Sequence, residues 1–169
     1  MQHVRLVSLT PAYRELFFEE ELANYADEQV RDTGWEPDTA VERARAELGP
    51  VLERELAEYA DREQRLWTAL NSAGEPVGWL WVTPVEDEPR TSAFLYQITV
   101  AANLRRRGYG GAMLSALEDL LTHEGFRELR LNVSPANEPA RNMYAASGYE
   151  LVGQDERRCQ MRKPLTPST

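Results

Sequence analysis

Residues 3–9 alternate between polar and apolar side chains, which predicts a short strand. After this strand, apolar residues recur at the spacing of helices. Thr10-Pro11 then offers an N-cap followed by proline at the first helical position, so a helix should begin there. A second helix should begin at a capping box formed by Thr39 and Glu42. Gly49-Pro50 interrupts its apolar pattern and should kink or split it.

From residue 65 the apolar pattern changes to the period of strands. The predicted strands are 65–70, 77–83, 91–100, 128–133, 149–152 and 157–163. One helix should follow the glycine-rich turn 103–111 and stop at Gly125, and another should span 138–147. In the strand 91–100, alternation places Phe94, Tyr96, Ile98 and Val100 on one face and Leu95, Gln97 and Thr99 on the other.

The order of these elements predicts the fold class. The strand, turn, helix and strand across 91–133 form a crossover that should be right-handed and join parallel strands, whereas the hairpins add antiparallel pairs. We therefore expect an α/β protein with a central mixed, mostly antiparallel sheet of about seven strands, flanked by about four helices. The domain should span residues 1–163 and be followed by a short C-terminal tail, 164–169.

The composition is that of one ordinary globular domain. The chain has 169 residues, of which 42% are hydrophobic and 28% charged. The net charge of −9 argues against a nucleic-acid partner, and no apolar run is long enough for a membrane span. Cys159 is the sole cysteine, so no internal disulfide is possible and we expect a cytoplasmic protein. We expect it to be a monomer or homodimer. His3 and His123 lack partners at metal-ligand spacing, so no metal is expected.

The sharpest chemical signal is the turn that opens the third helix. Its residues are Arg105, Arg106, Arg107, Gly108, Tyr109, Gly110 and Gly111. Glycines let backbone N–H groups converge there, the helix N-terminus adds partial positive charge, and arginines can bond phosphate oxygens, which together suit a pyrophosphate. A dinucleotide fingerprint would need glycine at Met113, and a P-loop would need a lysine in the turn. The alternative is a helix cap with solvated arginines.

A second motif lies downstream, in residues 131–149. A strand is followed by Asn137, by Ala140 three positions later, by Tyr144 four positions after that, and then by Gly148-Tyr149. This stretch resembles the pattern of the GNAT superfamily of acyl-CoA-dependent N-acetyltransferases. Arg105, Gly108 and Gly110 match the Arg/Gln-x-x-Gly-x-Gly/Ala motif of the same family, in the right order and at a familiar separation. The resemblance covers about residues 64–163.

The resemblance implies an N-acetyltransferase that moves an acetyl group from acetyl-CoA to a primary amine by direct attack in a ternary complex. It also implies that the strand ending at Val100 splays from the strand 131–133, with the pantetheine arm of acetyl-CoA in the gap. The residues that it places near acetyl-CoA are Ile98, Thr99, Val100, Arg105, Arg106, Arg107, Gly108, Tyr109, Gly110, Gly111, Asn137, Ala140 and Tyr144.

Two of these residues have implied catalytic roles. The backbone N–H of Ile98 would polarise the thioester carbonyl, and Tyr144 would protonate the departing CoA thiolate. The alternative for Tyr144 is an aromatic side chain that packs a helix on the sheet. Asn137 can serve as an N-cap for its helix and still lie beside acetyl-CoA.

The sequence does not identify a general base. Some family members have a glutamate on the fourth strand, but the aligned position here is near Phe94. The polar groups of that strand are Tyr96, Gln97 and Thr99, and the acidic residues 86–88 precede it. The alternative reading is therefore a non-catalytic acyl-CoA-binding module of GNAT-like fold.

Charge is uneven along the chain and bears on the acceptor. Residues 1–100 contain 20 Asp and Glu against 9 Lys and Arg, a net −11, whereas residues 101–169 contain 8 against 10, a net +2. In the family, the first half usually forms the acceptor side. A negative cleft concentrates cations, so we expect a cationic amine, with residues 19–21 and 86–88 near the mouth of the site. The alternative is that these carboxylates only keep the protein soluble.

Overall fold

A computed structural model describes residues 2–60 and 65–167 of the chain. The predicted order of elements is confirmed. The strands are β1 (Arg5–Ser8), β2 (Arg65–Leu70), β3 (Pro76–Pro84), β4 (Ser92–Val100), β5 (Glu128–Val133), β6 (Glu150–Gln154) and β7 (Cys159–Pro164). The helices are α1 (Pro11–Thr33), α2 (Ala40–Ala60), α3 (Tyr109–His123) and α4 (Glu138–Ala146), with 3-10 turns at Pro37–Thr39 and Ala102–Leu104.

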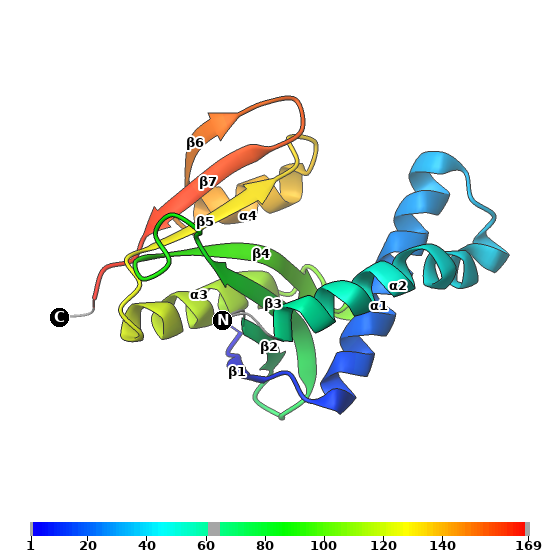
Figure 1. The fold of residues 1–169 in the computed structure, drawn as a ribbon, viewed down its shortest axis with the longest axis horizontal. Coiled ribbons are helices and arrows are strands. Elements are labelled where there is room, and N and C mark those ends of the chain that lie inside the picture. The colour runs from blue at the N-terminus through cyan, green and yellow to red at the C-terminus, as the bar shows by residue number, and fades with distance from the viewer. Residues whose placement is uncertain (1, 61–64, 168–169) are drawn as a thin grey trace.

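All seven strands form one sheet in the order β1-β2-β3-β4-β5-β7-β6. Among the described strands, β4 and β5 run parallel, with α3 as the crossover between them, and the other neighbours are antiparallel. The predicted mixed, mostly antiparallel α/β fold is therefore confirmed. Figure 1 shows β1 to β4 below and β5, β7 and β6 rising at the upper left.

The helices pack on opposite faces of the sheet. On one face, Phe17 of α1 and Leu52 and Leu56 of α2 bury Trp79 and Trp81 of β3. On the other face, a larger core joins α3 and α4 to the sheet, with Met113, Leu117, Leu80, Leu131, Tyr144 and Cys159 among its members. Trp79, Trp81 and Cys159 are each buried. In Figure 1, α1 and α2 lie at the right, beside β2 and β3.

Both N-terminal helices begin at the predicted positions. Thr10 caps α1, since its side chain accepts a hydrogen bond from the Tyr13 N–H at 3.2 Å. At α2, the helix begins at Ala40, directly after Thr39, and the 3-10 turn Pro37–Thr39 leads into it. Of the predicted kink or split at Gly49-Pro50, the split is wrong, because α2 continues through Pro50. Ala44 before this point and Leu52 after it are both buried, so packing overrides the local propensity of proline.

The alternation predicted for β4 is wrong beyond Leu95. Trp81 pairs with Gln97, but the next residue of β3, Val82, pairs with Leu95, so Tyr96 is an extra residue in a β-bulge. Because of the bulge, Tyr96 and Gln97 point to the same side, toward α1 and α2. Tyr96 contacts the Trp81 ring at 5.0 Å between centroids. Leu95, Ile98 and Val100 instead pack in the core formed with α3 and α4.

The fold continues slightly past the expected start of the tail at residue 164. Pro164 ends β7, and Leu165 is buried, with its N–H donating to the Arg127 carbonyl at 2.7 Å. Residues 168–169 of the expected tail lie outside the described residues.

Candidate active site

The two central strands separate toward their C-terminal ends. β4 and β5 pair from Ser92 opposite Glu128 to Leu95 opposite Leu131, and the ladder stops there. Figure 1 shows β4 and β5 side by side at the left and diverging toward the right. The splay that the resemblance implied is present, and it begins at the bulge in β4.

The splay leaves backbone donors of β4 without a strand beside them. The Ala101 N–H, just after β4, donates to the Val77 carbonyl of β3 at 2.9 Å, so Ala101 and Val77 form a hydrogen-bonded pair. Residues of an antiparallel ladder alternate, and Thr99 is therefore the next residue bonded to β3. The N–H groups of Ile98 and Val100 consequently point to the opposite edge, where β5 has moved away.

A pocket of about 340 Å³ fills the opening between the two strands. Its lining comes from β4, β5, α3, α4 and the loop before α4, namely Leu95, Tyr96, Gln97, Ile98, Val100, Gly110, Asn132, Val133, Ser134, Asn137, Ala140, Met143 and Tyr144. Six of the predicted site residues are therefore together: Ile98, Val100, Gly110, Asn137, Ala140 and Tyr144.

The phenol of Tyr144 lines this pocket. Its side chain is only 6% exposed, and burial raises the pKa of the phenol to about 12. The group is thus fully protonated at neutral pH and can donate a proton but not accept one. Among the described residues, no hydrogen bond to the phenol is present, and its ring meets Tyr149 edge to face at 5.7 Å. The Tyr144 hydroxyl is therefore available to a ligand.

A polar network supports Tyr149 from behind. The Tyr149 hydroxyl lies 3.1 Å from the carboxylate of Glu118 in α3, and Lys163 of β7 donates to the same carboxylate at 2.9 Å. Burial and the adjacent Glu118 charge raise the pKa of Tyr149 far above its ordinary value. The only lysine of the chain is thus held in an ion pair that joins α3 to β7.

The glycine-rich turn has the backbone of an anion site. Arg106 and Gly108 adopt left-handed conformations, with φ of 63° and 88°. Left-handed backbone at a residue other than glycine is uncommon and clusters at ligand sites. Gly108 is the N-cap of α3, and Ala112 is the first residue to donate back along the helix, to the Gly108 carbonyl. The N–H groups of Tyr109, Gly110 and Gly111 therefore remain for a ligand.

The glycines of this turn have different roles. A Cβ atom at Gly110 would lie 2.8 Å from the Met143 sulfur of α4, so the Met143 side chain would have to move. A Cβ atom at Gly111 would meet nothing within 4 Å. Substitution of Gly110 would consequently disturb packing, whereas substitution of Gly111 would change the anion site alone.

The three arginines of the turn differ in their contacts. The Arg105 guanidinium donates to the Asn24 side chain of α1 at 2.6 Å and to the Val100 carbonyl at 3.3 Å. It thus points to α1, away from the N–H groups of the turn. Arg106 and Arg107 are exposed. The prediction that all three contact a pyrophosphate therefore stays open for Arg106 and Arg107, while Arg105 links the turn to α1.

Asn137 has the capping role expected of it. Its side chain accepts a hydrogen bond from the Ala140 N–H at 3.3 Å and begins α4. Both residues also line the pocket. Thr99 is buried on the other face of β4, so its side chain lies outside the pocket lining.

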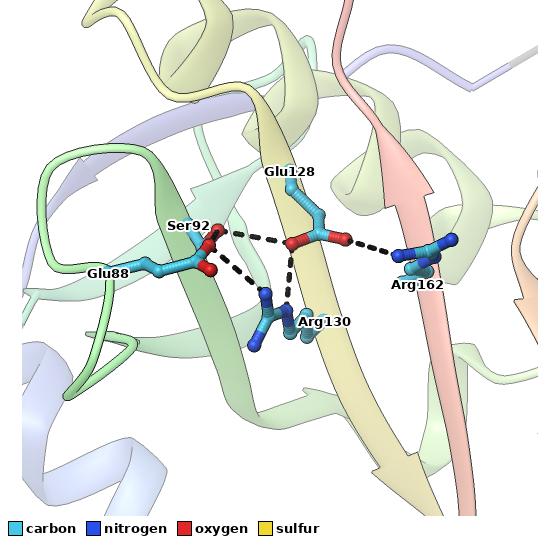
Figure 2. A network of polar contacts seen from close by, with 5 residues as sticks. All are labelled: Glu88, Ser92, Glu128, Arg130 and Arg162. Atoms are coloured by element: carbon cyan, nitrogen blue, oxygen red, sulfur yellow. Dashed lines mark hydrogen bonds and ion pairs between the residues drawn. The ribbon is translucent and has the colours of Figure 1, made fainter. Parts of the chain in front are cut away.

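Where β4 and β5 are still paired, a charged network joins them to β7 (Figure 2). The Ser92 hydroxyl lies within hydrogen-bond distance of both Glu88 and Glu128. Arg130 contacts both carboxylates, at 3.1 and 2.7 Å, and Arg162 reaches Glu128 from β7. Although burial alone would raise the pKa of Glu128, the bonds from Arg130 and Ser92 lower it. Glu88 therefore belongs to this network and not, as predicted, to the mouth of the pocket.

The sequence placed Glu21 among the acidic residues 19–21 expected near the mouth of the site, without a role that set it apart from its neighbours. Glu21 of α1 is partly buried and bonds the side chains of Gln97 and Thr99 on β4, the latter at 2.7 Å. A signal for it exists in the sequence, because Glu21 follows the buried Phe17 by four positions and so shares its inward helical face. Its neighbours differ: Glu19 pairs with Arg45 of α2, and Glu20 approaches the Ala102 N–H.

The described residues contain neither a candidate metal site nor a candidate membrane-spanning helix. No group of three or more His, Cys, Asp or Glu residues in residues 2–60 and 65–167 could hold a metal ion. Within the same part of the chain, no helix combines the length and apolar character that a membrane crossing needs.

Known proteins with similar sequences and folds are acetyltransferases. The model of the acetyltransferase (GNAT) family matches residues 14–149. The uncharacterized N-acetyltransferase YycN of Bacillus subtilis (strain 168) is 29% identical over 127 residues, 75% of this chain and 80% of YycN. The solved structure of Bacillus subtilis YycN has a TM-score of 0.67 at 25% identity and covers 90% of this chain and 95% of its own. An aminoglycoside 6′-N-acetyltransferase complexed with coenzyme A has the same TM-score, 0.67, at 15% identity, over 98% and 99% of the two chains.

Proposed function

Because the chain belongs to the acetyltransferase (GNAT) family and is an acyltransferase, we propose that it transfers an acetyl group from acetyl-CoA to a primary amine. The amine attacks the thioester directly in a ternary complex, without a covalent enzyme intermediate. One observation carries this proposal: the pocket between the splayed strands joins free backbone donors on β4 to the phenol of Tyr144. The aminoglycoside acetyltransferase of similar fold was solved with coenzyme A, which supports the choice of donor.

The opened edge of β4 suits the thioester end of acetyl-CoA. The N–H groups of Ile98 and Val100 point into the pocket and can bond the amide and thioester carbonyls of the extended pantetheine arm, as a neighbouring strand would. At Ile98 the donor would stabilise negative charge that develops on the thioester oxygen. A preorganised donor of this kind contributes about 3 kcal/mol to transition-state stabilisation.

Tyr144 suits the leaving group. When the C–S bond breaks, the CoA sulfur gains negative charge and needs a proton. The buried Tyr144 phenol is protonated at neutral pH and lines the same pocket. We therefore assign it the role of general acid.

The turn before α3 suits the pyrophosphate of CoA. The N–H groups of Tyr109, Gly110 and Gly111 and the dipole of the helix meet at one point. Arg106 and Arg107 are exposed beside it and can add charge-assisted bonds to phosphate oxygens. Asn137 and Ala140 close the opposite wall at the start of α4.

The acceptor is proposed to be a cationic amine. The first half of the chain contains the negative excess, and Glu20 and Glu21 of α1 lie against the end of β4. Glu19 contributes less, because Arg45 offsets its charge. A negative approach to the site would concentrate a cationic acceptor, and salt would weaken this attraction.

A panel of cationic, neutral and anionic amines tests the proposal, with release of the CoA thiol as the readout at low and high ionic strength. We expect thiol release that depends on the amine, with the highest kcat/KM for a cationic amine and a decline as salt is added. Tight binding of acetyl-CoA without thiol release for any amine would instead favour a non-catalytic acyl-CoA-binding module. A preference for an anionic acceptor would contradict the charge argument. So would a cationic acceptor whose kcat/KM does not change with salt.

A further inference from the structure

The carboxylate of Glu21 lies against the part of β4 that borders the pocket. One carboxylate oxygen accepts from the Gln97 side chain and the other accepts from the Thr99 hydroxyl at 2.7 Å. Gln97 itself lines the pocket and lies at the bulge where the strands begin to separate. Each carboxylate oxygen has two lone pairs, so both can accept a further hydrogen bond.

Glu21 and Tyr144 lie on opposite sides of the sheet. Glu21 reaches Gln97 and Thr99 from α1, whereas Tyr144 packs with Ile98 and Val100 in the core formed by α3 and α4. The end of β4, which borders the gap, lies between these two groups. A thioester held in the gap would therefore have an acid on the side of α4 and a carboxylate on the side of α1.

We propose that Glu21 is the general base of the reaction and accepts a proton from the acceptor amine, directly or across one water. This assignment rests on the proposed function. The base would come from α1 and not from the fourth strand, where Phe94 lies near the position at which some family members have a glutamate. It also places the amine on the α1 side of the sheet, the side where the acidic residues of the first half lie.

The proton balance of the step is complete. The ammonium form of the acceptor gives one proton to Glu21, which later releases it to solvent. The neutral nitrogen attacks the thioester carbon, an N–C bond forms, and the C–S bond breaks. The CoA sulfur takes the proton of Tyr144, and the second proton that leaves nitrogen restores the phenol through water. The products are an N-acetylamine, CoA thiol and one proton.

The surroundings of Glu21 suit a base. Burial raises the pKa of its carboxyl, while the bonds from Thr99 and Gln97 partly offset this rise. The charged groups that act on it are Glu20 of the same helix, which raises the pKa, and Arg105, which lowers it. A carboxylate with a raised pKa takes a proton from an ammonium group more readily near neutral pH. Arg105 also links this region to the turn that precedes α3, through Asn24 and the Val100 carbonyl.

A comparison of two variants and two amines tests the assignment. Glu21→Gln keeps the shape of the side chain and loses the base, and Glu28→Gln makes the same charge change at an exposed position of α1. One amine is strongly basic, and the other, methoxyamine, is already neutral at pH 7. With the basic amine, Glu21→Gln should lower kcat by about 100-fold or more, and its remaining rate should rise with pH because only neutral amine reacts.

With methoxyamine the same variant should lose less than roughly 5-fold, because no proton has to be removed before attack. Glu28→Gln should match the wild type with both amines, and all three proteins should bind acetyl-CoA equally well. Equal losses for the two amines would reduce Glu21 to a group that positions Gln97 and Thr99, and the proposed function would stand. A wild-type protein that releases no thiol with either amine would overturn the proposed function and the base together.

A titration of the wild-type protein tests Glu21 without any variant. Carbon NMR of the side-chain carboxyl groups should find that Glu21 titrates above the ordinary range of glutamate. Titration within or below that range would overturn the assignment, whatever the variants do.

Discussion

β4 and β5 form one pair of strands whose two ends differ in nearly every respect. At the N-terminal end, Ser92 to Leu95 pair with Glu128 to Leu131, and the network of Figure 2 joins side chains across three strands. At the C-terminal end, the N–H groups of Ile98 and Val100 face a pocket instead of a strand. At the first end, the polar groups bond one another within the protein. At the second end, the backbone N–H groups remain for a ligand.

The difference arises from a single extra residue. The bulge at Tyr96 turns the end of β4 away from β5 and moves Gln97 to the face of α1. Bulges increase local twist and end regular pairing, and they often lie next to active sites. The paired end fixes the position of both strands, so the open end can remain unpaired without collapse.

The phenol at the open end should give the largest effect. Tyr144→Phe removes the proton donor and keeps the buried ring, so kcat should fall by about 100-fold or more while the Kd of acetyl-CoA changes by less than roughly two-fold. Steady-state kinetics and calorimetry measure the two quantities. Tyr149→Phe is the matched control, because its hydroxyl already bonds Glu118 and should affect stability more than kcat. Unchanged turnover in Tyr144→Phe would leave that residue a packing role only.

The anion site at the start of α3 should give the next largest effect. Gly111→Asp places a negative charge beside the proposed pyrophosphate, in space that is open to a side chain. The Kd of acetyl-CoA should rise by about 100-fold, since one like charge near phosphate at the protein surface costs a few kcal/mol. An acidic residue in the first turn favours the helix, so the melting temperature should not fall.

Ser72→Asp adds the same charge in the exposed β2–β3 turn and should leave the Kd unchanged. A folded Gly111→Asp protein with wild-type affinity would show that the pyrophosphate binds elsewhere.

The closed end should affect stability and little else. Glu128→Gln weakens the bonds to Arg130 and Arg162 and should lower the free energy of unfolding by about 1–2 kcal/mol. The folded-state pKa of Glu128 lies below that of the unfolded chain, so this contribution is fully present above the unfolded-state pKa and disappears as the pH falls through the lower, folded value. The stability difference between wild type and variant should therefore shrink in acid.

Urea unfolding between neutral pH and about pH 3 measures this effect, and Glu156→Gln, in an exposed turn, is the control. A variant that binds acetyl-CoA more weakly at neutral pH would show that the two ends are not independent.

The elements and their order could be predicted because each depends on local pattern. The bounds predicted for β2 and β5 match the structure, as does the N-cap Thr10 of α1. Two motifs near α3 and α4 placed Gly110, Asn137 and Tyr144 in one site, and the structure brings them to one pocket.

Features that depend on tertiary contacts could not be predicted. Strict alternation along β4 gave no sign of a bulge, because the bulge is defined by pairing with β3. Proline in α2 suggested a break, but buried residues on both sides hold the helix together. Glu21 was grouped with Glu19 and Glu20 as one acidic run near the mouth of the site, although the three have separate partners on β4, α2 and the start of the turn.

Amide hydrogen exchange along β4 tests the central claim most directly, because it compares the two ends of one strand in one experiment. In the free protein, the N–H groups of Ile98 and Val100 should exchange much faster than that of Leu95. Acetyl-CoA should slow exchange at Ile98 and Val100 and leave Leu95 as it was. Exchange at Ile98 and Val100 that is already slow in the free protein, or that saturating acetyl-CoA does not change, would contradict a thioester bound at the open end.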